Sequence, residues 1–288
     1  MAVIVFEHAS WQAVLLCLLF AVIYVGSLYV WAGSTEKNRD HPDVIRKRFV
    51  SITVVSVVVP VLVWLAGRSS ESKQAHTLWE WLGLRFLGFL PAFIIPLILT
   101  MVLFMGPLAL HYMDGIFRLY LEPRYWVNCI KNMIWVRNHI VAPFSEEFIF
   151  RACMLPLLVP AIGESAAMIL CPLFFGVAHF HHLIERIIHE QCEIKQAVQK
   201  SMFQFFYTTV FGIYSAFLFL RTGHLIAPVI AHAFCNHMGF PAFNEVMGYP
   251  QTIRRRLAMF FVLGLVLWIM VLFPLTYPAL YANDVYVL

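Results

Sequence analysis

The stretch at 142–158, APFSEEFIFRACMLPLL, places ionisable side chains in an otherwise apolar segment. Two carboxylates, Glu146 and Glu147, and one guanidinium, Arg151, lie within it. An ionisable side chain inside a membrane-spanning helix is costly and usually faces the interior of a helix bundle or a water-filled cavity. Each of the three is therefore a candidate for a functional site.

The two adjacent carboxylates differ in the partners that their own helix offers. Glu147 and Arg151 are four residues apart, so they share a helix face and can form an ion pair that braces the helix. Glu146 points about 100° away and has no partner in its own helix. Its carboxyl group must become protonated, meet a partner from another helix, or meet water. Glu146 is thus the stronger candidate for chemistry.

Two later apolar segments carry further polar side chains at helical spacing. Phe175 and His179 are four residues apart, and so are His232 and Asn236. Residues four apart lie on one helix face, so His232 and Asn236 can direct two hydrogen-bond donors to one point, which suits a developing oxyanion. The alternatives are a hydrogen-bonded core histidine at 179 and a polar pair at 232 and 236 that holds helices together.

The composition indicates a membrane protein. Only 12% of the 288 residues are charged and 61% are hydrophobic, whereas soluble domains average roughly 25% charged residues. We predict an all-α polytopic membrane helix bundle in one domain over 1–288, whose first apolar run is a retained span and not a cleaved signal. About eight transmembrane helices are expected, at 11–32, 49–66, 86–110, 135–158, 165–183, 202–220, 224–240 and 257–277.

The basic residues predict the orientation. With an exoplasmic N-terminus, fifteen of the twenty Lys and Arg residues, including Lys37, fall in cytosolic loops. Four, including Lys73, fall on the other side, and Arg151 lies within a span. This asymmetry follows the positive-inside rule. The stretches 111–134 and 184–200 mix aromatic or aliphatic residues with charges, which is typical of helices at the headgroup level or of solvated connectors.

The predicted depths bring the polar residues together. Glu146 is eleven residues into a span that enters from the cytosol, which is roughly 16 Å deep. His179 lies near the cytosolic end of its span, His232 lies midway along its own, and Asn236 lies beyond it. We expect these four side chains to meet near the membrane midplane or in its cytosolic half, in a cavity that opens to the cytosol.

This set of residues suits peptide hydrolysis. A carboxylate beside an imidazole can hold a water molecule and remove its proton, and a second histidine with an amide can hold the oxyanion. We expect no metal and no cofactor. A zinc-dependent metalloprotease using the same residues is an alternative, although catalytic zinc usually takes three His, Glu, Asp or Cys ligands. A proton-coupled transporter is another, but no inverted repeat is evident.

Three motifs carry a family resemblance. EEFIFR (146–151), FGVAH (175–179) and HAFCN (232–236) resemble the EExxxR, FxxxH and HxxxN motifs of the type II CAAX prenyl proteases. These are the Ras-converting endopeptidases of the wider CPBP group, some of whose members are non-catalytic scaffolds. All three motifs occur in the family's order, on separate predicted spans, and together they cover 146–236.

The resemblance implies a glutamate-type intramembrane protease of the endoplasmic reticulum, with its active site open to the cytosolic side. It would remove the C-terminal tripeptide from farnesylated or geranylgeranylated CAAX proteins such as Ras-like small GTPases. Its other partner would be the lipid bilayer, and no nucleic-acid partner is expected. Glu146 and His179 would activate the water, and His232 and Asn236 would form the oxyanion hole. The supporting residues would be Glu147, Arg151 and Phe175.

Overall fold

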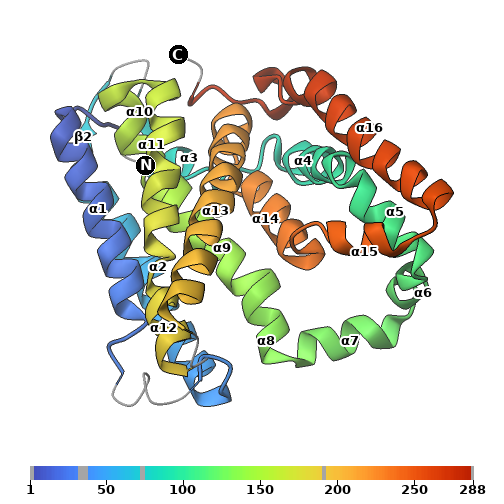
Figure 1. The fold of residues 1–288 in the computed structure, drawn as a ribbon. Helices are drawn as coiled ribbons and strands as arrows, with labels where there is room; N and C mark the ends of the chain where they lie inside the picture. Colours follow the sequence, from blue (N-terminus) through green and yellow to red (C-terminus); the bar gives the residue numbers. More distant parts are fainter. Residues whose placement is uncertain (1–2, 32–37, 72–74, 190–192, 287–288) are drawn as a thin grey trace.

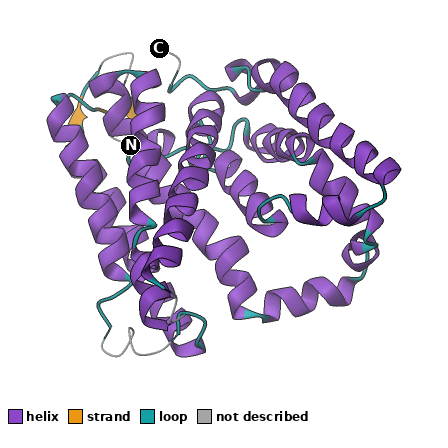
Figure 2. Cartoon of the chain, viewed as in Figure 1, coloured by secondary structure: helices purple, strands orange, loops and turns teal. Residues whose placement is uncertain are grey.

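The computed structural model describes residues 3–31, 38–71, 75–189 and 193–286, without the side chain of residue 189. Two of the basic residues used to orient the chain, Lys37 and Lys73, lie outside this part of the chain. Helices make up nearly all of the described secondary structure, and strands are confined to one small corner (Figure 2).

Five helical segments are long and apolar enough to cross a membrane, and they confirm the predicted all-α helix bundle. A sixth is obtained if α4 and α5, which are bent by 73° at their junction, count as one span. The five segments are α1 (Ser10–Ser27), α2 (Pro42–Ala66), the run of α11 (Glu164–Ala178) into α12 (His181–His189), α13 (Ile194–Thr222) and α16 (Gln251–Leu275), and the bent pair is α4 (Phe89–Leu103) with α5 (Met105–Met113).

The count of eight spans stays a prediction, because the other two predicted spans are not single long helices among the described residues. The segment at 224–240 contains α14 (Ile226–Met238), which has only 13 residues. The segment at 135–158 is helical except for a turn at Met154, but it is divided into short pieces. These are α8 (Met133–Val136), a π-helix (Arg137–Val141), α9 (Ala142–Glu147), a second π-helix (Phe148–Cys153) and α10 (Leu155–Ile162).

A proline after the first π-helix leaves one backbone carbonyl, that of Asn138, without its helical hydrogen bond. The backbone N–H of Ala142 bonds to the carbonyl of Arg137, five residues back. The next bond in that pattern would run from Pro143 to Asn138, but proline has no N–H to donate. The side chain of Asn236 donates to the Asn138 carbonyl instead, at 2.9 Å. The irregular helix is thereby tied to α14, and π-helical turns of this kind often occur at functional sites.

The helices pack around a central pair, α11 and α13 (Figure 1). α1 and α2 lie on one side of this pair, and α4, α14 and α16 lie on the other. The main buried cluster joins α1, α2, α10, α11 and α13, with Phe20, Phe150 and Phe219 among its fully buried side chains. Large apolar side chains on the outer face of α16 are exposed, as expected for a helix that faces lipid; they are Met259, Val262, Val266, Ile269 and Phe273.

The remaining elements are short. β1 (Val3–Val5) pairs antiparallel with β2 (Arg68–Ser69) and with β3 (His76–Thr77), so Ile4 lies opposite both Ser69 and His76. This small sheet was not predicted from the sequence. Trp81 at the end of α3 (Leu78–Trp81) covers it by donating from Nε1 to the Ile4 carbonyl at 2.9 Å. The other short helices are α6 (Ile116–Tyr120), α7 (Pro123–Lys131), α15 (Phe243–Gly248) and a 3-10 turn (Pro278–Tyr281).

Candidate active site

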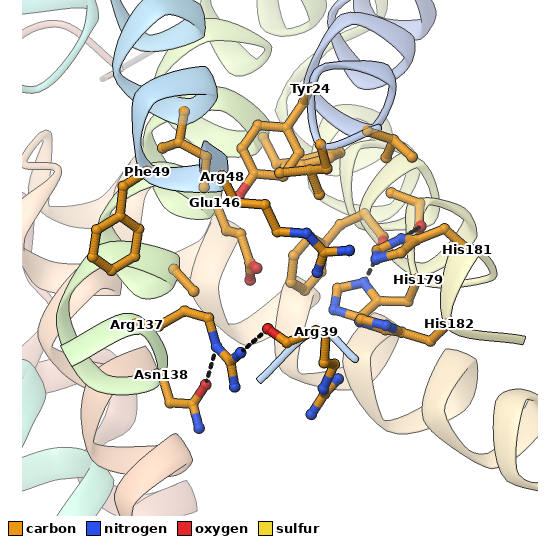
Figure 3. A pocket seen from close by; sticks show the side chains of 17 residues that line it. Tyr24, Arg39, Arg48, Phe49, Arg137, Asn138, Glu146, His179, His181 and His182 are labelled. Atoms are coloured by element: carbon orange, nitrogen blue, oxygen red, sulfur yellow. Dashed lines mark hydrogen bonds between the residues drawn. The ribbon is translucent and has the colours of Figure 1, made fainter. Parts of the chain in front are cut away.

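A cavity of about 140 Å³ lies where α1, α2, α9, α11 and α12 meet (Figure 3). Glu146 and His179, which the sequence predicts as partners in water activation, both line it. They come from different helices and are 33 positions apart in the chain. The side chains of Tyr24, His181 and His182 complete this part of the wall.

Glu146 keeps contact with the cavity and has few polar neighbours. Its side chain is 19% exposed. Among the described residues, the basic side chain recorded beside it is His232, whose Nε2 lies 3.7 Å from Glu146 Oε2. That distance is too long for a hydrogen bond. The carboxylate oxygens are therefore free to bind a small polar molecule in the cavity.

The orientation of His179 is fixed by the backbone of its own helix. Nδ1 of its ring lies 2.8 Å from the carbonyl oxygen of Phe175. A carbonyl oxygen can only accept a hydrogen bond, so Nδ1 carries the proton and donates. In the neutral ring, Nε2 then holds the lone pair and can accept a proton. The Phe175 ring lies edge-on to the imidazole, with centroids 4.5 Å apart, and limits its rotation.

Glu147 lies in a packed polar cluster behind the cavity and is completely buried. The ion pair predicted with Arg151 is present, with Arg151 Nε 3.2 Å from Glu147 Oε2. The hydroxyl of Ser215 on α13 donates to the same oxygen. Nδ1 of His232 on α14 donates to Glu147 Oε1 at 2.7 Å. Glu147 thus joins three helices, a wider role than the bracing of its own helix that we expected from the sequence.

Arg151 is held by an aromatic ring as well as by Glu147. Its guanidinium carbon lies 4.4 Å from the centroid of the Phe175 ring, within the range of a cation–π contact. Gly212 on α13 leaves the space for this group, since a Cβ there would lie 2.9 Å from Arg151 Nη2. Among the described residues, none of the three guanidinium nitrogens has a hydrogen-bond acceptor. The positive charge therefore depends on Glu147 and Phe175.

His232 and Asn236 lie on the same helix but have different partners. The ring of His232 bridges the two carboxylates, with Nδ1 toward Glu147 and Nε2 toward Glu146. Asn236 donates from Nδ2 to the carbonyl of Asn138, a residue that lines the cavity. The structure therefore brings Glu146, His179 and His232 together, and it places Asn236 beside them with one amide proton already used.

Several residues around the site were not singled out from the sequence. Ser215 anchors Glu147, and the hydroxyl of Tyr24 hydrogen-bonds the hydroxyl of Ser145 at 3.0 Å beside the cavity. Arg48 and Arg137 line the cavity, although their sequence positions fit the positive-inside pattern equally well. Isolated hydroxyls in apolar helices and basic residues at span ends are too common to indicate a site by themselves.

One candidate cation site exists among the described residues, but it does not use the predicted catalytic set. His181, His182 and Glu185 have ligand atoms within 4.8 Å of one another. Glu185 also forms an ion pair with Arg48, at 2.6 Å between Nη2 and Oε1. A guanidinium at that distance already compensates the carboxylate and would repel a metal ion. Glu146, His179 and His232 do not form such a group in this part of the chain.

Comparisons with known proteins place the chain in a family. Residues 129–238 match the family described as Type II CAAX prenyl endopeptidase Rce1-like. Over 280 residues the chain is 47% identical to CAAX prenyl protease 2 of Homo sapiens, which covers 95% of this chain and 84% of the human protein. The chain belongs to the CAAX prenyl protease 2 family. It is therefore a protease with several membrane-spanning helices.

More distant members of the CAAX prenyl protease 2 family align over similar lengths. The Rattus norvegicus protein is 41% identical over 280 residues, with 95% of this chain and 82% of the rat protein covered. The Arabidopsis thaliana protein is 30% identical over 303 residues, with 94% and 91% covered. No solved structure matches the chain. The matched segment 129–238 contains all four of the predicted catalytic residues.

Proposed function

We propose that this protein removes the C-terminal tripeptide from prenylated CAAX proteins, using a water molecule activated by Glu146 and His179. The observation that carries the proposal is that both side chains line one cavity, each with its reactive atoms unoccupied by close hydrogen bonds from the described residues. The substrate class comes from the relatives, which are named CAAX prenyl protease 2.

The cavity geometry suggests how water would be activated. The Glu146 carboxylate orients a water molecule, and either that carboxylate or His179 Nε2 accepts its proton as the oxygen attacks the carbonyl carbon of the prenylated cysteine. The carbon–nitrogen bond to the next residue then breaks. The accepted proton passes to the leaving amine, which departs with the tripeptide. No acyl-enzyme forms, because water is the nucleophile.

His232 and Asn236 would stabilise the negative oxygen that forms in this step. His232 already donates from Nδ1 to Glu147, so its ring must carry both protons for Nε2 to donate to the oxyanion. The Glu147 carboxylate accepts from Nδ1 and so orients the ring, and Ser215 and Arg151 hold Glu147 in place. Asn236 uses one amide proton for the Asn138 carbonyl, and its second amide proton can point to the substrate.

The substrate also explains why the site lies among membrane helices. Each CH₂ of a farnesyl or geranylgeranyl chain gains about 0.8 kcal/mol when it is buried in lipid. The prenylated cysteine of a Ras-like small GTPase is therefore held at the bilayer, close to a site of this depth. The excess of basic residues in the predicted cytosolic loops supports a site that opens to the cytosol, and the family supports the endoplasmic reticulum membrane.

The test is a cleavage assay on the purified full chain in neutral phosphatidylcholine vesicles. The substrate is a fluorogenic peptide that ends in a farnesylated CAAX sequence, and mass spectrometry identifies the products. We expect one cut after the prenylated cysteine, no cut in the unprenylated peptide, and loss of activity in Glu146→Gln. The matched control is Glu245→Gln, which removes an exposed carboxylate far along the chain. A cut at another bond, or full activity in Glu146→Gln, would refute the proposal.

A further inference from the structure

The cavity that holds Glu146 and His179 is also lined by arginines. Arg39, Arg48 and Arg137 all border it, and Figure 3 shows all three among the side chains around Glu146 and His179. A water-activating site does not need three guanidinium groups. A substrate that is cut three residues from its free end, however, carries a negative α-carboxylate near the scissile bond.

Arg48 is a buried guanidinium with an unused donor. Its side chain is only 10% exposed. Nη2 is paired with Glu185 at 2.6 Å, and the guanidinium lies 5.5 Å from the centre of the Tyr29 ring. Its Nε is buried and has no hydrogen-bond partner among the residues that the structure describes. A buried donor without a partner is unfavourable, so this guanidinium gains from a carboxylate that enters the cavity beside it.

Arg137 is held in a fixed orientation at the same cavity. Nε donates to Asn138 Oδ1 at 2.9 Å, and Nη1 donates to the Arg39 carbonyl at 3.1 Å. Nη1 also lies 2.9 Å from Asp40 Oδ1. Within the described ranges Nη2 forms no hydrogen bond. A guanidinium that is already oriented loses little side-chain entropy when it binds a carboxylate.

The spacing along the chain matches the length of a tripeptide. Arg137 and Glu146 lie on one continuous helical segment, nine residues apart, which corresponds to a rise of about 13 Å. Both residues line the same cavity, so their side chains face one space. An extended tripeptide spans about 10 Å. A scissile bond at Glu146 therefore places the terminal carboxylate near Arg137.

We propose that Arg48 and Arg137 form a binding site for the C-terminal α-carboxylate of the substrate. Guanidinium groups bind carboxylates through strong, charge-assisted hydrogen bonds. Such a site fixes the distance between the free chain end and the cut, so it selects the third peptide bond from the terminus. This inference rests on the function proposed above.

The test compares two farnesylated peptides that differ only at the terminus, one with a free carboxylate and one with a C-terminal amide. In phosphatidylcholine vesicles, we expect the wild-type protein to cleave the acid with a kcat/KM about tenfold or more above that of the amide. In Arg137→Gln and in Arg48→Gln this ratio should fall toward one, because kcat/KM for the acid decreases more than kcat/KM for the amide. Arg137→Lys and Arg48→Lys keep the charge but lose the planar fork, so they should give intermediate ratios.

The matched control is Arg46→Gln, which removes an exposed positive charge from the same helix as Arg48, two residues away and outside the cavity lining. It should keep the wild-type ratio. Since the ratio compares two substrates on one protein sample, a merely structural role of an arginine lowers both rates and leaves the ratio unchanged. If Arg48→Gln does not fold because Glu185 loses its ion pair with Arg48, Arg48→Lys supplies the measurement.

Distinct results overturn this proposal. Equal cleavage of acid and amide by the wild-type protein contradicts it while leaving the proposed function intact. So do arginine variants that slow both peptides equally. A second series with phosphatidylserine in the vesicles tests whether the arginines bind a lipid headgroup instead, in which case the variants change the response to phosphatidylserine and leave the acid-to-amide ratio unchanged. If the wild-type protein cleaves neither peptide, the proposed function itself fails, and this inference fails with it.

Discussion

Glu146 and Glu147 are neighbours in the sequence, yet the fold gives them opposite environments. Glu147 is completely buried and has three partners, one each from α13 and α14 and one within its own helical segment. Glu146 lines a cavity, and His232 Nε2 lies 3.7 Å from its carboxylate. Adjacent residues point about 100° apart on a helix, so one side chain enters packed protein and the other enters open space.

This contrast separates two kinds of polar group in a membrane bundle. A buried carboxylate whose lone pairs are satisfied fixes the positions of the helices that supply its donors. A carboxylate with unsatisfied oxygens is held ready for a ligand. Here the first kind supports the second, because Glu147 orients the His232 ring whose other nitrogen faces Glu146. Mutations of the two residues should therefore differ in what they damage.

The largest effect on activity is expected for Glu146→Ala. Loss of a general base typically costs 10²–10⁴-fold, and we expect kcat on the farnesylated peptide to fall by about a thousandfold. Thermal unfolding in detergent should stay close to that of the wild type, because no described residue forms a close polar contact with Glu146 that the variant would lose. A large loss of stability with retained activity per folded molecule would show that the two carboxylates have the reverse roles.

The largest effect on stability is expected for Glu147→Ala. Removal of one partner leaves Arg151 as a buried, uncompensated charge, and breaking a buried pair costs about 3–5 kcal/mol. Chemical denaturation monitored by tryptophan fluorescence would measure this loss. The double variant Glu147→Gln with Arg151→Met removes both charges and should recover part of it. Failure of the double variant to gain stability over Glu147→Ala would argue against the ion pair as the cause.

Asn236→Ala tests the link between α14 and the irregular helix. The variant removes the amide that bonds the Asn138 carbonyl and the second amide proton assigned to the oxyanion. Loss of one oxyanion donor costs about 10²-fold in kcat, and the lost hydrogen bond should lower stability by about 1 kcal/mol. Cleavage assays and denaturation on the same sample measure both. Unchanged kcat would remove Asn236 from the oxyanion hole and leave it a structural residue.

Phe175→Leu should lower kcat less than Asn236→Ala does, and it should affect stability more than activity. The Phe175 ring contributes a cation–π contact to Arg151, worth about 1–2 kcal/mol in a buried setting. The group that fixes the His179 tautomer is the Phe175 backbone carbonyl, which this substitution keeps. We expect a stability loss of that size and a kcat within a few fold of the wild type. A collapse of kcat would show that the ring, and not the carbonyl, positions His179.

The smallest expected effect is that of a chelator. The proposed reaction uses only protein side chains and water, so dialysis against 1,10-phenanthroline should leave the cleavage rate unchanged. Added zinc should likewise not increase it. Activity that disappears on chelation and returns with zinc would instead support the metalloprotease alternative that the sequence leaves open.

The sequence by itself determined the features that depend on composition and on the period of one helix. Long apolar runs specify membrane helices. Inside a bilayer no water is present to bond the backbone N–H and C=O groups, and a helix bonds these groups to one another. Spacing of four places Glu147 beside Arg151 and directs Glu146 elsewhere, because the helical repeat sets which side chains share a face. The three motifs were sufficient to indicate the family, because their residue types and order are properties of the chain alone, and the relatives confirmed it.

Only the tertiary structure decided which residues from distant segments meet. Glu147 and His232 are 85 residues apart, and Asn138 and Asn236 are 98 apart, so neither contact follows from local periodicity. Arg48 and Arg137 look like ordinary basic residues at span ends in the sequence, and only the packing of the helices shows that they line the cavity. Contacts of this kind depend on how whole helices are placed against one another, which is set by the summed shape and polarity of many side chains and not by any single motif.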